Sequence, residues 1–172
     1  MTSSVSEPDQ QLSDSGELLL DYLDYYRSVI GAKIDGMPEA ALRDSRLPSG
    51  WTPLELLKHL VHMEQRWLRW GFRGEQVSAP WGDRGPADRW YVGPEETAAD
   101  LLAALHAGGE YTRSVVTGTP LSTVAAAGGR FSDDGGPRPT LGWILFHVLH
   151  EYARHAGHLD IVRELTDGVT GE

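Results

Sequence analysis

Apolar residues recur at helical spacing in four stretches of the chain, and polar or glycine- and proline-rich segments separate these stretches. In the first stretch, Asp14 can cap a helix, and Glu17 three residues later completes a capping box. Gly36 followed by Pro38 ends this helix, and one further short turn is expected over 38–43. The apolar positions of the first helix are Leu18, Leu19, Tyr22, Tyr26, Val29 and Ile30.

The second stretch has the strongest start signal. Thr52 is expected as the N-cap, Pro53 suits the first helical position, and Glu55 lies three residues after the cap. The pattern predicts a helix that continues to about Phe72. Its apolar positions are Leu56, Leu57, Leu60, Met63, Trp67 and Leu68.

Two further helices follow. Pro94 is expected to open the third, and the glycine pair at 108–109 indicates a kink or a close helix contact in its middle. Thr140 is expected to cap the last helix, which runs to about Thr166 and stops before Gly168.

Long connections follow the second and third helices. Residues 73–93 contain glycines, prolines and aromatic residues, so this segment is either functional or is pinned to the helices by its tryptophans. Residues 118–139 predict a loop with a short strand pair at 123–127 and 130–132. Four amphipathic helices without a convincing sheet predict an all-α four-helix bundle, whose helix order the pattern does not decide.

Composition narrows the class of protein. The chain has 172 residues, and we expect a disordered polar tail over 1–12 and one bundle domain over 13–168. A formal net charge of −10 argues against nucleic-acid and anionic-membrane partners, which select basic surfaces. No apolar run approaches the roughly 20 residues that span a bilayer. The start of the chain lacks a basic and apolar leader, so a cytoplasmic protein is expected.

The chain has no cysteine, which excludes disulfides, thiolate ligands and a cysteine nucleophile. On the last helix, Glu151 and His155 lie four residues apart and therefore project from one face. This face borders the apolar stripe, and a buried carboxylate there needs a partner. His59 on the second helix points inward better than His62 does. The predicted site is a divalent transition-metal site formed by His59, Glu151 and His155.

Other interpretations of these residues stay open. Most Glu-x-x-x-His pairs on helices are surface ion pairs. His62 could replace His59 as a ligand, and His147 could replace a ligand or support one. His158 could replace a ligand or hydrogen-bond one, although simple packing beside Gly157 explains it equally well.

A family resemblance rests on two separated motifs. They are Gly50-Trp51-Thr52-Pro53 with Lys58-His59-Leu60, and Glu151-x-x-x-His155 with Gly157-His158. Together they resemble the DinB-like metalloenzyme family, in particular small actinobacterial proteins of unknown function related to the mycothiol-dependent maleylpyruvate isomerases. The resemblance covers about residues 15–167.

The resemblance implies a four-helix bundle with a metal-binding triad, and it places His59, Glu151 and His155 at the ligand positions. Members of known activity mostly use mycothiol, bacillithiol or glutathione, which would explain how a protein without cysteine carries out thiol chemistry. Zinc is the first expectation for the metal and nickel the second. A homodimer is a further expectation, since several members form one.

We therefore expect a metal-dependent transferase or isomerase that uses a small thiol and acts on a small molecule. The sequence assigns no catalytic residue beyond the ligands. Arg84, Arg89 and Arg154 are candidates for binding a substrate carboxylate, and no spacing chooses among them. The alternative is a non-catalytic bundle that binds a small ligand or takes part in a stress response.

Overall fold

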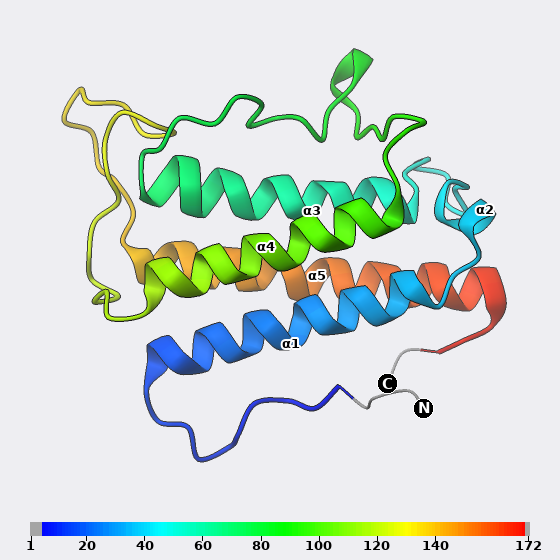
Figure 1. Cartoon of the computed structure of the whole chain (residues 1–172), viewed down its shortest axis with the longest axis horizontal. Coiled ribbons are helices and arrows are strands. Elements are labelled where there is room, and N and C mark those ends of the chain that lie inside the picture. The colour runs from blue at the N-terminus through cyan, green and yellow to red at the C-terminus, as the bar shows by residue number, and fades with distance from the viewer. Residues whose placement is uncertain (1–4, 171–172) are drawn as a thin grey trace.

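The computed structural model describes residues 5–170 and contains four long helices packed as a bundle (Figure 1). The all-α prediction is confirmed, and within residues 5–170 the β-structure consists of isolated bridges alone. The helices are α1 (Ser15–Asp35), the short α2 (Glu39–Leu42), α3 (Pro53–Trp67), the π-helical turn η1 (Leu68–Phe72), the 3-10 turn η2 (Pro86–Asp88), α4 (Ala98–Val116) and α5 (Leu141–Asp167).

Three of the four predicted helix starts are confirmed by side-chain caps. The Asp14 carboxylate accepts from two backbone N–H groups of α1, Thr52 and Glu55 form a complete capping box at α3, and Thr140 caps α5. Gly168 ends α5 in the left-handed conformation, with φ 76°.

The predicted start of α4 at Pro94 is wrong. The Glu96 carboxylate accepts from the Gly93 N–H at 2.7 Å and from Lys58 at 2.7 Å, which holds this stretch in a turn. The helix begins after Thr97, whose hydroxyl accepts from the Asp100 N–H at 3.1 Å.

The helix order, which the sequence left open, follows from the contacts between helices. Helix α1 packs between α4 and α5, and α3 packs between the same two on the opposite side of the bundle. Helices α1 and α5 run in one direction, and α3 and α4 run in the other (Figure 1). The connection from α3 to α4 therefore has to return along the whole bundle, and residues 73–97 do this beside α3.

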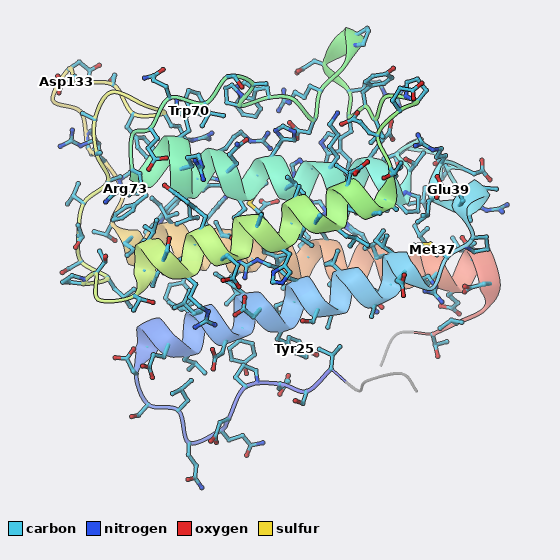
Figure 2. The ribbon with its side chains drawn as sticks, viewed as in Figure 1. Tyr25, Met37, Glu39, Trp70, Arg73 and Asp133 are labelled. Atoms are coloured by element: carbon cyan, nitrogen blue, oxygen red, sulfur yellow. The ribbon has the colours of Figure 1, made fainter. Side chains whose placement is uncertain are left out.

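The second long connection, residues 117–140, folds over one end of the bundle. Figure 2 shows Asp133 at its outer tip and Trp70 where it meets η1. The predicted strand pair is absent from this described segment, because its backbone donates elsewhere: Ala126 N–H to the Phe72 carbonyl at 2.8 Å and Arg130 N–H to the Trp70 carbonyl at 3.0 Å. The bridge that does form joins Val124 to Thr140.

A buried polar cluster lies within the apolar core. The Glu64 carboxylate of α3 accepts hydrogen bonds from Arg27 of α1, from Thr112 of α4 and from Tyr152 of α5, the last at 2.6 Å. Helix α4 stays continuous at its glycine pair, where a Cβ on Gly109 would lie 3.0 Å from the Arg27 side chain. Of the two expectations for these glycines, the close contact is therefore the one observed.

The N-terminal segment over 5–14 forms no helix and runs back beside α1, near Tyr25 (Figures 1 and 2). Residues 1–4 of the predicted tail lie outside the described residues. The tail and the domain boundary at residue 13 stay predictions.

Candidate metal centre

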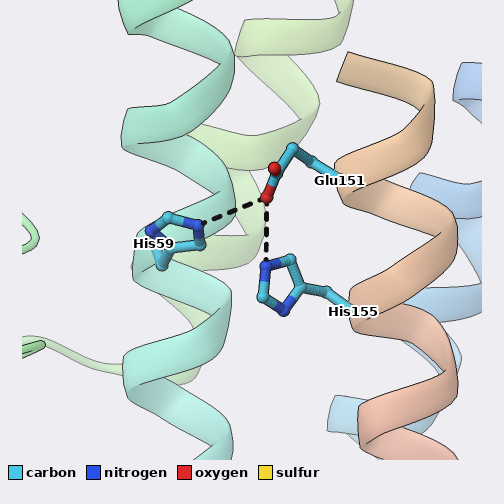
Figure 3. A group of neighbouring side chains, drawn as sticks. All are labelled: His59, Glu151 and His155. Atoms are coloured by element: carbon cyan, nitrogen blue, oxygen red, sulfur yellow. Dashed lines mark ion pairs between the residues drawn. The ribbon is translucent and has the colours of Figure 1, made fainter. Parts of the chain in front are cut away.

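The structure brings the three predicted ligands together between α3 and α5 (Figure 3). One potential ligand atom from each of His59, Glu151 and His155 lies within 4.8 Å of the other two. Glu151 Oε2 is 3.3 Å from His155 Nε2 and 3.9 Å from His59 Nε2. The spacing of four residues places Glu151 and His155 one turn apart on α5, as expected. Their role as ligands stays a prediction.

His59 is oriented by the connection between α3 and α4. Its Nδ1 lies 2.9 Å from Asp83 Oδ2, and its ring stacks on Trp90 with centroids 4.3 Å apart. If Nδ1 donates to Asp83, Nε2 is left as a lone-pair donor that faces Glu151. Histidines that bind metals are commonly held in this way by a carboxylate.

Asp83 is itself fixed by a buried arginine. Arg66 donates to both Asp83 oxygens, at 2.6 and 3.1 Å, and the Asp83 side chain is fully buried. Burial would raise the pKa of Asp83, but the hydrogen bonds from His59 and Arg66 and the charge of Arg66 outweigh it and hold the pKa well below its usual range. Asp83 is therefore a carboxylate at neutral pH.

His155 is buried and uncharged at neutral pH. Burial, followed by the charge of His59, lowers its pKa to about 4. Its Nδ1 lies 3.3 Å from His158 Nδ1, so His158 contacts a predicted ligand, as one of the two interpretations held. The ring of His158 also lies 6.2 Å from that of Trp51, centroid to centroid, so the packing interpretation stays open. A neutral imidazole is the form that binds a metal.

The alternative ligands lie outside the three-residue group. His62 Nδ1 is buried and has no hydrogen-bond partner among the described residues. His147 Nε2 lies 3.8 Å from the second oxygen of Glu151, and its ring stacks on Trp143 with an interplanar angle of 7°. His147 thus lies beside Glu151 but outside the three-residue group, and His59 is the α3 histidine in that group.

Sequence reasoning found His59, Glu151 and His155 but missed Asp83. Helical periodicity relates residues on one helix, whereas Asp83 reaches His59 from a loop with no regular spacing. The one available signal was the length and aromatic content of residues 73–93. Trp90 gives that segment a direct contact with the site, and the same stack pins the loop to α3, so both interpretations of the loop stay open.

Two of the three arginines proposed for a substrate carboxylate are already engaged. Arg84 pairs with Asp88 at 2.6 Å, and Arg89 donates to the Ser49 carbonyl at 2.8 Å. Arg154 is exposed on α5. A cavity of about 610 Å³ is lined by Trp51, Arg89 and Trp90, and Trp90 is the residue that stacks on His59.

The donor set fits a divalent transition metal. Two imidazole nitrogens and one carboxylate oxygen are borderline ligands, and three protein ligands leave positions for water or a substrate. The orientation of His59 by Asp83 supports this fit, because it aims Nε2 at the carboxylate.

The bundle and its facing histidine, glutamate and histidine define a protein of the DinB-like class. A family model described as Mycothiol-S-transferase matches residues 18–168, so the chain belongs to this family. The predicted resemblance is thereby confirmed. The crystal structure of a conserved protein from Enterococcus faecalis is similar, with 16% identity, a TM-score of 0.61 and coverage of 91% of this chain and 99% of that chain. That likeness shows the fold alone.

No curated protein sequence matches the chain. Among the described residues, no helix is both long and apolar enough to cross a bilayer. The family supports transferase chemistry that involves mycothiol.

Proposed function

We propose that this protein is a metal-dependent S-transferase that joins a small thiol of the mycothiol type to a small electrophile. The observation that carries the proposal is the convergence of His59, Glu151 and His155 between α3 and α5 in a member of the mycothiol-S-transferase family. In the reaction, the bond from sulfur to the electrophilic carbon forms as the bond from that carbon to the leaving group breaks. The leaving group departs with the bonding electrons, and the thiol proton is released.

The side chains have separate roles in this proposal. His59 and His155 each present Nε2, and Glu151 presents Oε2, as ligands. Zinc, with nickel as the alternative, would supply a Lewis acid that favours the thiolate of a bound thiol. Asp83 and Trp90 hold the His59 ring, so the α3 ligand is oriented before anything binds. The chain has no cysteine, so the reacting sulfur comes from the thiol substrate.

The test begins with metal content. Protein purified without a histidine tag and supplied with zinc or nickel is analysed by mass spectrometry, alongside His59→Ala, Glu151→Ala and the control His106→Ala, which alters an exposed histidine of α4. We expect one metal per chain in the wild type and the control, and a loss in the two ligand variants. Failure of the wild type to hold either metal would refute the metal site.

Catalysis is tested separately with mycothiol and an aryl chloride electrophile. Conjugate formation is expected in the metal-loaded wild type and is expected to vanish in the ligand variants. If the wild type holds the metal but forms no conjugate with any thiol and electrophile pair, the non-catalytic alternative replaces the transferase proposal. A homodimer, the other implication of the family, is checked by light scattering.

A further inference from the structure

Arg130, in the connection between α4 and α5, has a backbone fixed to η1. Its N–H donates to the Trp70 carbonyl at 3.0 Å, and Trp70 lies in the π-helical turn η1 that follows α3. The residue before it is Gly129, where a Cβ would lie 2.1 Å from that same oxygen. The close approach therefore requires glycine, and it holds Arg130 at one place on the bundle.

The guanidinium of Arg130 lies among tryptophans. Its Cζ is 4.2 Å from the ring centroid of Trp67, 5.8 Å from that of Trp81 and 6.0 Å from that of Trp70. A guanidinium stacked on an aromatic face keeps its N–H groups directed outward in its own plane. Such a group is prearranged for two parallel hydrogen bonds to a carboxylate.

Arg130 differs from the neighbouring arginines in having no counter-charge. Arg66 and Arg84 also lie over Trp81, each at 4.4 Å, but Asp83 neutralises the first and Asp88 the second. Among the described residues, no carboxylate pairs with Arg130. Burial and then the charge of Arg66 lower its pKa, and no acidic group opposes this shift. An unpaired, partly buried cation favours an anionic ligand.

The Arg130 guanidinium is joined to the candidate metal centre by two rings. Trp67, on which it stacks, lies 4.4 Å from the His147 ring, centroid to centroid. His147 Nε2 in turn lies 3.8 Å from Glu151 Oε1. Arg130 also acts on His147 through its charge, which contributes to lowering the pKa of His147, so the guanidinium lies near the edge of the candidate metal centre.

We propose that Arg130 binds a carboxylate on the electrophilic substrate and so selects acidic electrophiles over neutral ones. This inference rests on the proposed function for the identity of the ligand as a substrate. The unpaired charge of Arg130, the tryptophans around it and its backbone hydrogen bond do not depend on that function.

A matched pair of probes, phenylacetate and phenylacetamide, tests the binding. Tryptophan fluorescence follows each titration in zinc-loaded and in chelator-treated protein, because Trp67 and Trp81 adjoin the guanidinium. We expect the wild type to bind the carboxylate about tenfold to a hundredfold more tightly than the amide, as charge-assisted hydrogen bonds imply. Arg130→Gln should abolish this preference, and Arg138→Gln, which alters an exposed arginine of the same connection, should keep it.

Three results would overturn the proposal. The first is equal affinity of the wild type for the two probes. The second is a carboxylate preference that survives in Arg130→Gln. The third is a preference that appears only with zinc, which would assign the anion to the metal. If Arg130 had a purely structural role, Arg130→Gln would bind both probes more weakly by the same factor. That result would also contradict the proposal.

Metal content and thiol conjugation separate this inference from the proposed function. Arg130→Gln is expected to retain zinc and to lose kcat/KM for a carboxylate-bearing electrophile by about tenfold or more, with little change for its neutral analogue. If the wild type neither holds metal nor conjugates thiols, the proposed function fails. The comparison of phenylacetate with phenylacetamide still decides the role of Arg130.

Discussion

The contact between Asp83 and His59 provides the sharpest test of how the site is held. Asp83→Asn keeps the shape of the side chain but removes its charge. One of its two terminal atoms becomes an N–H donor, and that donor must face either His59 Nδ1 or the Arg66 guanidinium. Both of these are themselves donors in the wild type.

The size of the effect follows from burial. The side chains of Arg66 and Asp83 are 4% and 0% exposed, so the variant leaves a desolvated guanidinium without its counter-charge. Breaking a buried pair costs about 3–5 kcal/mol, and the amide oxygen retained in the variant favours the lower end of this range. For a chain of this length, about 3 kcal/mol lowers Tm by about 6–12 °C. Loss of the partner of His59 should also weaken zinc affinity by about 10-fold to 100-fold.

Urea unfolding of the metal-free protein measures the first quantity, and competition with a zinc chelator measures the second. Asp88→Asn is the control, because Asp88 pairs with Arg84 in the same connection but its side chain is 75% exposed. That variant should lose less than about 1 kcal/mol and keep its zinc affinity. Equal stability losses in the two variants would refute the reasoning from burial, and unchanged zinc affinity in Asp83→Asn would refute the orienting role.

Three further predictions concern the bundle. Gly157→Ala should stabilise the protein by about 0.5–1 kcal/mol, because the new Cβ on α5 meets open space. Gly129→Ala should destabilise it by about 1–3 kcal/mol, because the new Cβ would lie 2.1 Å from a backbone carbonyl oxygen. Urea titration measures both changes in unfolding free energy, and changes of the same sign would contradict this reasoning. The pKa of His155 is lowered from 6.5 to about 4 by burial and a neighbouring histidine, so its contribution to stability is present above pH 6.5 and is lost as the pH falls toward 4. The metal-free protein should lose about 2 kcal/mol between pH 7 and pH 4.5, and an unchanged slope in His155→Asn would oppose this assignment. Tyr152→Phe should cost about 1–2 kcal/mol in thermal unfolding, because the buried Glu64 carboxylate loses a hydroxyl donor; a neutral result would show that water replaces it.

Local sequence signals predicted much of the fold. Thr52 with Glu55, and Thr140, marked helix starts because capping depends on residues only a few positions apart. The start of α4 was wrongly predicted at Pro94, because proline fits the first turn of a helix. The Glu96 carboxylate keeps this stretch out of α4 by accepting hydrogen bonds from Gly93 and from Lys58, which is distant in sequence. Helix order also depends on contacts between distant segments, so periodicity alone could not supply it.

The residues of the candidate site also divide into those that local sequence patterns predict and those that long-range contacts place. Glu151 and His155 are linked by the helical repeat, and His59 was found because its position on a second apolar face could be judged independently. Asp83 and Arg130 could not be found, since each reaches its place from an irregular connection through long-range backbone or side-chain contacts. The arginines named from the sequence were those of residues 73–93 and α5, while the unpaired cation lies in the connection between α4 and α5.

Because α3 and α4 run in the same direction, the strap of chain between them must travel the full length of the helices outside their packed faces. That connection supplies both the acceptor and the stacking partner of one candidate ligand, and its Trp90 and Val92 also pack against the hydrophobic core. A substitution in this connection therefore changes the surroundings of His59 while the helical residues that present the candidate ligands stay the same.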